Sequence, residues 1–417
     1  MLRRVYTCRQ IRSGGGPKAE ARLAPFPQMG FLRIAVTPGS RGAANAAPAQ
    51  ARGGKDGNDE APKERKNHRD TDASRTWDGS CSLAAIQLGS PSRWYTLPMK
   101  ALVISRLGDP DVLEVRQVPD PVPTPGQELV EGEAGGINFA DIMSAQGGYP
   151  GTPKPPLVAG REFCGIRSDG QRVMGYAQWG AFAERIAASS ALVWPVPQAW
   201  SAEEGAAFPV NYFTAYFAYW KAGLLQKLAD TPAPRVLIHA VAGGVGTAAV
   251  QIGKLLGVEM YGTSSSEEKL ARVNALGLQH GINYRQRDYE EAVKDLTHGE
   301  GVDAVFEMLG GEHTMKSVRC LRDFGRVIVY GAATGQPGQF DPRVLYAKGA
   351  SVHGLWLTYV SAKRELMNQA WEQLSEWMAQ GHLRPVVGHV FALEQASDAY
   401  RLLLERKNFG KVVLNLT

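Results

Sequence analysis

The chain has 417 residues, 44% hydrophobic and 21% charged, so it is long enough for two domains and has an ordinary globular composition. Its net charge of +5 is uneven, because residues 1–98 carry 16 Lys and Arg against 8 Asp and Glu, whereas residues 99–417 carry 30 against 33. The larger part therefore gives no reason to expect nucleic-acid binding, and no apolar run is long enough to predict a membrane span.

Residues 1–98 are rich in Gly, Ala, Pro, Ser and Arg and show no sustained apolar period, which predicts a disordered extension. Up to Lys55 this segment holds ten Lys and Arg and one acid, Glu20, which is similar to an organelle transit peptide and would imply a mitochondrial location. Alternatively Met99 is the true start, because a strand pattern opens there directly. We favour this second interpretation, which together with four scattered cysteines indicates a cytoplasmic protein.

The pattern of residues 99–212 predicts short strands and turns. Residues 128–134 alternate as a half-exposed strand, and a turn at 169–170 leads into another strand. Helical signals begin at Ser201, where Glu204 three residues later completes a capping box. This part is expected to be a small β domain.

The next part opens with an apolar strand at 235–238, followed by a glycine turn and a helix. Gly244, Gly246 and Ala249 fit the G-x-G-x-x-G/A spacing, in which small residues allow a tight turn, close approach of a pyrophosphate, and packing of helix on strand. The N-terminus of the helix would attract the phosphates. The segment is therefore interpreted as the first unit of a dinucleotide-binding domain.

Strands and helices continue to alternate over residues 213–352, which predicts a parallel sheet with helices on both faces. Strands are expected at 258–263, 302–307 and 326–330, and a helix capped by Ser266 ends at Gly277. Residues 353–417 should form a long amphipathic helix, a strand, a short helix and a last strand that return to complete the first domain.

Together these segments resemble the zinc-independent quinone oxidoreductase branch of the medium-chain dehydrogenase/reductase family, the branch that includes zeta-crystallin. The resemblance implies an α/β fold with a Rossmann nucleotide-binding domain inserted in a GroES-like β-barrel catalytic domain. One departure is a shortened connection between Gly165 and Gly170, expected at the barrel edge beside the substrate mouth. The stretches that carry the resemblance are 136–141, 147–150, 170–175, 211–216, 240–246, 262–269, 282–285 and 410–414.

Zinc is not expected. Zinc-dependent relatives have a Cys ligand where this chain has Asn138, and Gly-His-Glu where it has Gly160-Arg161-Glu162, so two of three ligands are missing. Glu162 is then interpreted as a structural partner, for example of Arg161 or Arg185.

NADPH is the expected cofactor. The predicted strand ending near Ser264 lacks the acid that binds the ribose hydroxyls of NAD and would repel a 2′-phosphate. By resemblance, Lys269 and Tyr284 would bind that phosphate, although Lys269 could instead be a solvated helix residue. The further cofactor contacts that the resemblance implies are Thr214, Gly243, Gly244, Val245, Gly246, Tyr330, Gly331, Ala332, Leu355 and Trp356.

The sequence shows no catalytic triad, paired carboxylates or nucleophilic cysteine. Hydride transfer to a quinone or enone needs placement and a donor for the developing oxyanion, and the resemblance implies Asn138 and Tyr149. A buried structural Asn and a packing Tyr are nearly equal alternatives, and His239 is expected to be a core or loop histidine and not a base. A 2-enoyl thioester reductase or a non-enzymatic NADPH-binding protein remain alternative functions. Homodimers are expected through a strand within residues 350–355.

Overall fold

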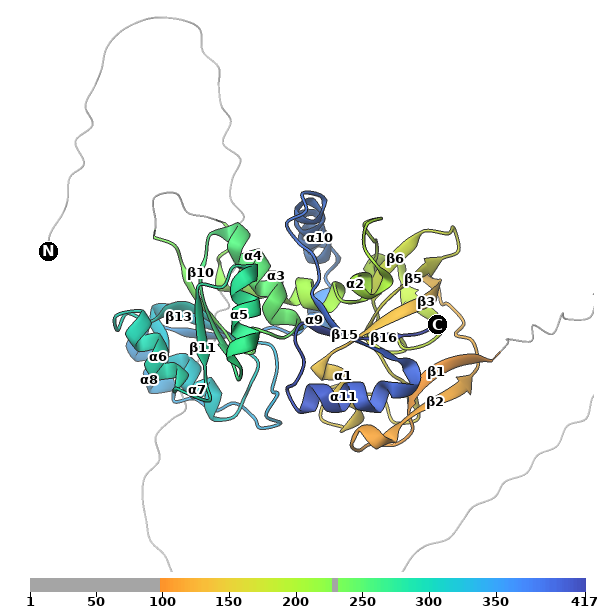
Figure 1. The fold of residues 1–417 in the computed structure, drawn as a ribbon, viewed down its shortest axis with the longest axis horizontal. Coiled ribbons are helices and arrows are strands. Elements are labelled where there is room, and N and C mark those ends of the chain that lie inside the picture. Colours follow the sequence, from red (N-terminus) through yellow and green to blue (C-terminus); the bar gives the residue numbers. More distant parts are fainter. Residues whose placement is uncertain (1–97, 227–231) are drawn as a thin grey trace, which may run out of the picture. The chain divides into compact units, whose positions relative to one another are not determined.

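The structure is a computed structural model that describes residues 98–226 and 232–417. The extension predicted to be disordered lies, apart from Pro98, outside the described residues. Figure 1 shows a strand-rich part around β1, β3 and β5 and a second part in which α4 and α5 cover a sheet. Within the two described ranges, no helix has the length and apolarity needed to cross a membrane.

The part up to α3 is mainly β-structure, with short helices in the connections. Its strands and helices are β1 (Met99–Ile104), η1 (Pro110–Val112), β2 (Leu113–Val118), β3 (Gln127–Ile137), α1 (Phe139–Ala145), β4 (Leu157–Val158), β5 (Glu162–Arg167), β6 (Arg172–Tyr176), β7 (Arg185–Ser189), η2 (Ser190–Leu192), β8 (Val193–Pro195), α2 (Ala202–Ala206) and α3 (Pro209–Ala222).

Strands and helices then alternate. They are β9 (Arg235–Ile238), α4 (Gly244–Leu256), β10 (Glu259–Ser264), α5 (Glu267–Leu276), β11 (His280–Asn283), α6 (Tyr289–Leu296), β12 (Val302–Glu307), α7 (Glu312–Arg319), β13 (Leu321–Val329), α8 (Pro342–Lys348) and β14 (Ser351–Gly354). The last elements are α9 (Leu357–Ser361), α10 (Arg364–Ala379), β15 (Val387–Ala392), η3 (Leu393–Gln395), α11 (Ala396–Leu404) and β16 (Lys411–Asn415).

The alternating elements form a six-stranded parallel sheet in the order β11-β10-β9-β12-β13-β14. This order, with the first strand in the middle, is that of a dinucleotide-binding Rossmann sheet. Successive residues of β9 face opposite sides: Val236 and Ile238 join the core under α4, whereas Leu237 joins the core under α6 and α7. A strand buried on both faces is therefore apolar at every position, which explains why its sequence does not alternate.

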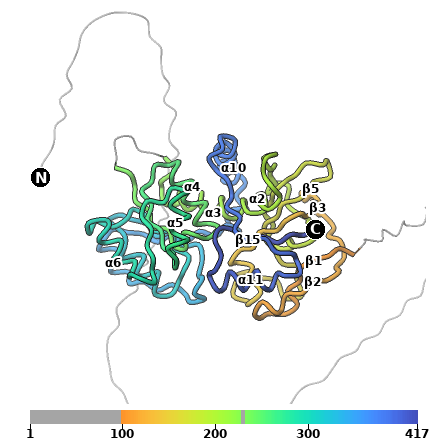
Figure 2. Tube along the Cα trace, viewed as in Figure 1, coloured from red at the N-terminus to blue at the C-terminus, as the bar shows by residue number. Residues whose placement is uncertain are grey.

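The end of the chain returns to the strand-rich part, where it pairs with β3. β16 pairs antiparallel with β3, from Val412 opposite Ile137 to Asn415 opposite Ala134, and β15 pairs with β16. The resulting sheet has the order β15-β16-β3-β5-β6-β8, with β7 on β3. Figure 2 shows this blue C-terminal stretch beside the strands coloured orange and yellow.

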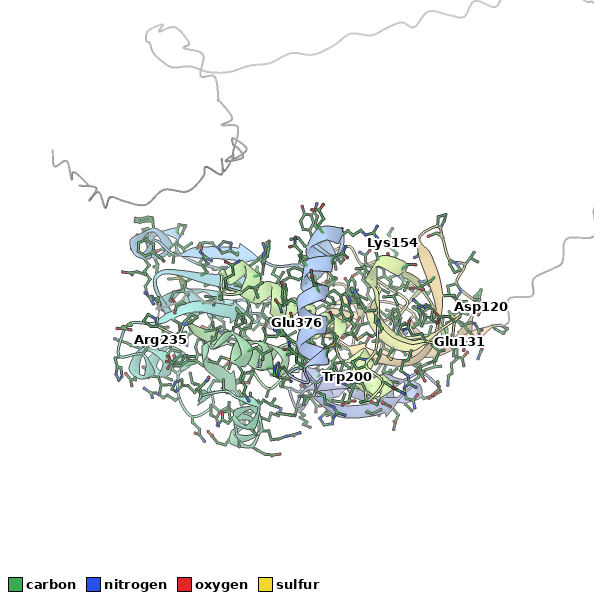
Figure 3. The ribbon with its side chains drawn as sticks, turned by 90° about the horizontal axis from the view of Figure 1, so that it is seen from above. Asp120, Glu131, Lys154, Trp200, Arg235 and Glu376 are labelled. Carbon is green, nitrogen blue, oxygen red and sulfur yellow. The ribbon has the colours of Figure 1, made fainter. Side chains whose placement is uncertain are left out.

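Helix α3 packs against both parts. Its Phe213 ring lies 4.6 Å from that of Trp194 on β8, and its Tyr219 hydroxyl donates to the carbonyl of Ala249 on α4. The predicted limit after residue 212 falls inside this helix, and the limit after residue 352 falls inside β14. Figure 3 shows α10, which carries Glu376, between the side with Arg235 and the side with Glu131. The domain limits stay a prediction.

The shortened connection after Gly165 forms a tight β5–β6 hairpin. Ile166 pairs with Arg172, and the Arg167 amide donates to the Gln171 carbonyl. All of residues 165–171 are described, and none of them lines the cavity described below. The shortened connection therefore takes no part in the lining of this cavity.

Candidate active site

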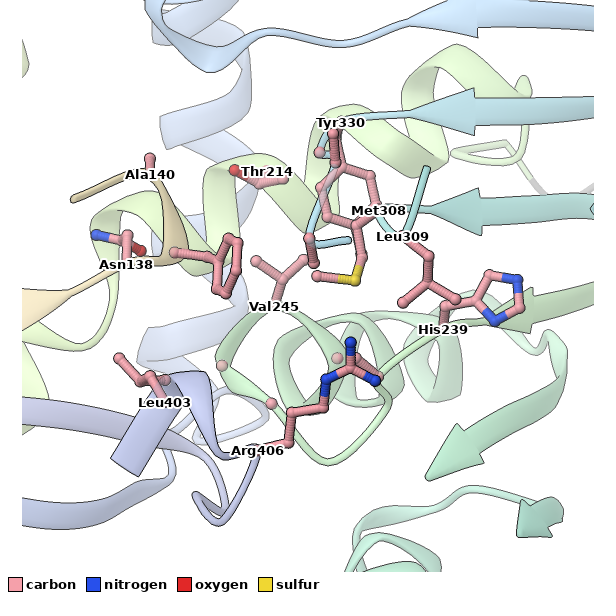
Figure 4. A pocket seen from close by; sticks show the side chains of 18 of the residues that line it. Asn138, Ala140, Thr214, His239, Val245, Met308, Leu309, Tyr330, Leu403 and Arg406 are labelled. Carbon is pink, nitrogen blue, oxygen red and sulfur yellow. The ribbon is translucent and has the colours of Figure 1, made fainter. Parts of the chain in front are cut away.

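A cavity of about 730 Å³ lies where the two parts meet. Its walls include the start of α1, the first turns of α3 and α4, the ends of β10 and β13, and the segment that leads into β16. In Figure 4, Asn138 and Thr214 lie on one side of this cavity, His239 and Leu309 on the other, and the guanidinium of Arg406 points between them. The volume suits a small organic ligand.

All residues predicted to bind cofactor or substrate line this one cavity, although they come from segments more than 200 residues apart. Their roles stay predictions. They are Asn138, Tyr149, Thr214, Gly243, Gly244, Val245, Gly246, Ser264, Lys269, Tyr284, Tyr330, Gly331, Ala332, Leu355 and Trp356.

The glycine turn joins β9 to α4 in a compact loop. Ala240 turns the chain with a φ of +48°, which is uncommon for a residue with a side chain and marks a constrained site. A Cβ on Gly246 would lie 2.4 Å from the Val241 carbonyl oxygen, so glycine is required there. Helix α4 starts at Gly244, and the amides at the start of a helix can bind an anion.

The polar end of β10 lies beside the helix α5 N-terminus. Ser266 caps α5 as predicted, by accepting from the Lys269 amide. The Lys269 ammonium donates to the backbone carbonyl of Arg406 at 2.7 Å. Partial burial lowers the pKa of Lys269, and nearby Arg285 and Arg272 lower it further, whereas Glu268 raises it. Lys269 therefore places positive charge at this end of the cavity, with two arginines nearby.

Arg406 is a cavity residue that sequence reasoning missed. It lies between α11 and β16 with a φ of +56°. A short way along the same segment, the Gly410 amide donates to the Ala242 carbonyl at 2.8 Å. The segment before β16 thus lies directly against the glycine turn, and through Arg406 it brings a further cation to the cavity.

Asn138 is held in a buried polar group at the other end. Its Nδ2 donates to the Gly136 carbonyl at 3.2 Å and to Glu162 Oε1 at 2.9 Å, and its Oδ1 accepts from the Lys411 ammonium at 2.7 Å. Lys411 also forms an ion pair with Glu162. Since both N–H groups of Asn138 already have acceptors, acting as the predicted oxyanion donor would require it to break one of these bonds.

The partner of Glu162 is therefore Lys411, and the expectation of Arg161 or Arg185 is wrong. Arg185 pairs with Asp120, and Glu162 Oε2 accepts from the Val210 amide. This arrangement does not fit a zinc ion, because the only carboxylate at the expected position already binds an ammonium. Within the described residues, no three His, Cys, Asp or Glu side chains gather as a metal-binding group.

Tyr149 lies in a cluster of hydroxyl and aromatic groups. Its hydroxyl oxygen accepts from Trp356 Nε1 at 2.7 Å and lies 3.5 Å from Thr358 Oγ1. Thr358 in turn lies 2.8 Å from the hydroxyl of buried Tyr176. Because Trp356 can only donate, the proton of Tyr149 is directed elsewhere, either to Thr358 Oγ1 or to a ligand.

Arg161 is buried behind Tyr149. Its guanidinium stacks between the rings of Tyr149 and Trp179, at 4.1 and 4.0 Å from their centroids, and its Nε lies 3.7 Å from Asp141 Oδ1. Burial raises the pKa of Asp141 to about 6, although Arg161 and the Asn138 amide pull it down. Arg161 therefore fixes the Tyr149 ring and partly compensates a buried carboxylate.

His239 is buried, as predicted. Its Nδ1 lies 3.1 Å from Thr263 Oγ1 and its Nε2 lies 3.1 Å from Ser317 Oγ, which donates to Glu307 at 2.5 Å. Burial lowers the pKa of His239 to about 4 against the opposing effect of Glu307. The imidazole is therefore neutral near neutral pH, and every ring nitrogen has a partner.

Comparison with known proteins identifies the family. Residues 244–380 match the family model described as zinc-binding dehydrogenase. The synaptic vesicle membrane protein VAT-1 homolog of Mus musculus is 34% identical over 347 residues, which cover 76% of this chain and 84% of that protein.

Solved structures agree with this relationship. The quinone oxidoreductase of Thermus thermophilus, also solved with NADPH, is 36% identical, with a TM-score of 0.68 over 76% of this chain and 100% of that one. The CurK enoyl reductase is 29% identical, with a TM-score of 0.68 over 76% and 99%. The chain thus belongs to the quinone oxidoreductase branch of the medium-chain dehydrogenase/reductase family, whose members bind a nicotinamide cofactor.

Proposed function

We propose that this protein uses NADPH to reduce a quinone or an α,β-unsaturated carbonyl compound without a metal ion. The observation that carries the proposal is that the glycine turn and Tyr149 line the same cavity. When bound, NADPH would supply a hydride. The glycine turn would bind its pyrophosphate, and Tyr149 would face the oxygen of the substrate.

Consumption of NADPH measured with a panel of quinones, enones and 2-enoyl thioesters tests this function. Turnover of quinones or simple enones supports the proposal, and a clear preference for enoyl thioesters supports the second candidate. That candidate is favoured by the likeness to an enoyl reductase and by the same Tyr149–Trp356 pair, which could serve a thioester oxygen. Tight NADPH binding without turnover of any compound would indicate a non-enzymatic binding protein.

The end of β10 supports NADPH over NADH, because it carries the hydroxyls of Thr263 and Ser264 where NAD enzymes have an acid, and Lys269 and Arg406 also line the cavity. Lys269→Ala should weaken NADPH binding by roughly tenfold or more, since a charge-assisted hydrogen bond contributes about 1.5–3 kcal/mol. NADH has no 2′-phosphate, so its dissociation constant should change little. Tyr284→Phe should act in the same direction but less.

Dissociation constants for both cofactors, measured on wild type and both variants, test this prediction. Lys294, an exposed lysine on α6, provides a matched control as Lys294→Ala. If Lys269→Ala weakens the binding of NADPH and of NADH equally, Lys269 does not bind the 2′-phosphate.

Activity without zinc is supported by the pairing of Glu162 with Lys411 and by the burial of Arg161 where zinc enzymes have a histidine. A further cation beside Lys411 would be repelled. Prolonged treatment with a chelator is therefore expected to leave NADPH consumption unchanged. Loss of activity that added zinc restores would contradict a metal-free mechanism.

We also propose a homodimer. β14 is the outer strand of the parallel sheet. Within the described ranges its outer edge pairs with no other strand, so it can pair with a second copy around a two-fold axis. Light scattering at micromolar concentration should give twice the mass of one chain. Replacing Val352 with proline removes an amide from this strand and should favour the monomer.

A further inference from the structure

Lys411 is a buried charged residue in the wall of the cavity. It begins the apolar strand β16, and only 3% of its surface is exposed. Its ammonium contacts two side chains, Asn138 Oδ1 and Glu162 Oε1. Burying an ammonium costs several kcal/mol unless it is paired, and here one carboxylate and one amide oxygen compensate it.

This group of three side chains has one donor to spare. An ammonium carries three N–H bonds, and Lys411 uses two of them on Asn138 and Glu162. Within residues 98–226 and 232–417, the third N–H has no acceptor. Both N–H groups of Asn138 are taken, and Glu162 can only accept. If this group of three contacts a substrate oxygen, Lys411 is the member that can donate.

We propose that Lys411 is a catalytic residue that stabilises negative charge on the substrate oxygen during reduction. The inference rests on the proposed function. Addition of hydride from NADPH, which is oxidised to NADP⁺, forms a C–H bond at the β-carbon of an enone. The C=C pair then forms a double bond from the α-carbon to the carbonyl carbon, and the C=O pair moves onto the oxygen. One proton from water then completes the reduction, while Lys411 keeps its own proton and donates a hydrogen bond throughout.

The surroundings of Lys411 make this bond effective. A donor fixed in a site that excludes water stabilises developing charge far more than the same donor in water. Asn138 and Glu162 hold the ammonium in place before the substrate arrives, so little reorganisation is needed. Glu162 also balances the charge of Lys411 in the resting site, which limits the cost of burial.

The decisive variant removes both charges. Lys411→Met alone leaves Glu162 buried without its partner and should destabilise the fold. The double variant Lys411→Met/Glu162→Gln removes the pair together and should keep the melting temperature and NADPH affinity near those of wild type. Its kcat should nevertheless fall about 100- to 1000-fold, as on removal of one oxyanion donor. Lys294→Met is the control.

A second readout does not depend on turnover. 4-Nitrophenol added to the protein with NADP⁺ should bind as the yellow phenolate, an analogue of the anionic substrate oxygen. The pKa of the bound nitrophenol should be lowered by wild type and by Lys294→Met, and this lowering should be lost in the double variant.

The outcomes separate the two proposals. If the folded double variant keeps kcat within a few-fold of wild type, or binds nitrophenolate as wild type does, Lys411 merely partners Glu162 and the inference is overturned. If wild type reduces no compound of the panel, the proposed function fails, and the nitrophenolate titration alone decides the role of Lys411.

Discussion

Gly246→Ala is expected to lower the affinity for NADPH by about ten- to a hundredfold, the equivalent of one lost charge-assisted hydrogen bond or slightly more. The added methyl would lie 2.4 Å from the Val241 carbonyl oxygen and 2.6 Å from that of Ala240. Both are backbone atoms, so the turn itself must move, and its amides leave the positions from which they would bind a pyrophosphate. Overpacking should also cost about 1–3 kcal/mol of stability.

Gly243→Ala is the matched control in the same turn. Gly243 has an ordinary φ of −85°, and the nearest atom to its added Cβ is the Ala240 carbonyl oxygen at 3.2 Å. Its melting temperature should therefore stay close to wild type. Calorimetry of unfolding and titration with NADPH test both variants, and an undiminished affinity in Gly246→Ala would contradict the assignment of the phosphate site.

Arg161→Met is expected to destabilise the protein by about 3–5 kcal/mol at neutral pH, the usual cost of breaking a buried ion pair. Asp141 would remain buried without its cation, and taking up a proton would relieve only part of this cost. The stacked layer that Arg161 makes with Tyr149 and Trp179 would also lose its guanidinium, so kcat should fall together with stability. Adding Asp141→Asn should recover part of the stability but not the position of Tyr149.

The pH dependence of stability provides a second check. The pKa of Asp141 is raised from 3.8 to about 6 in the folded protein, so the native state binds more protons than the unfolded state in that interval. This carboxyl therefore lowers stability as pH rises through the interval, and its full cost is present above it. Removing Arg161 should raise the pKa of Asp141 further, so that stability continues to fall up to a higher pH. A pH profile of the melting temperature identical to wild type would rule out this coupling.

Much of the fold could be predicted from local pattern. β9, the glycine turn and α4 combine an apolar run with glycines at fixed spacing, and α5 has a serine cap and a terminal glycine. β11 and α7 were not predicted, because only Ile282 is buried in β11 and α7 begins at a glycine without a side-chain cap. β13 starts five residues before its predicted limit, since Leu321 pairs with Val302 before an irregularity in the ladder.

The candidate site was predictable where the residues belong to known motifs, and less so elsewhere. Lys411 and Asn138 are 273 positions apart, and no local pattern brings them together. A single lysine at the start of an apolar strand was the available signal, because a buried ammonium needs a partner. Arg406 had no such signal, since it follows a helix in a charged segment and reaches the cavity only through the tertiary fold.

The contact between Gly410 and Ala242 has a consequence for biosynthesis. Residues 406–412 complete the cavity, yet they are translated after every other residue that lines it. While the ribosome is still extending the chain, the nucleotide-binding domain can fold but its ligand pocket stays open on one side. The cofactor should therefore not bind tightly to incomplete nascent chains. Tight binding of the nucleotide should begin only after this segment emerges from the exit tunnel.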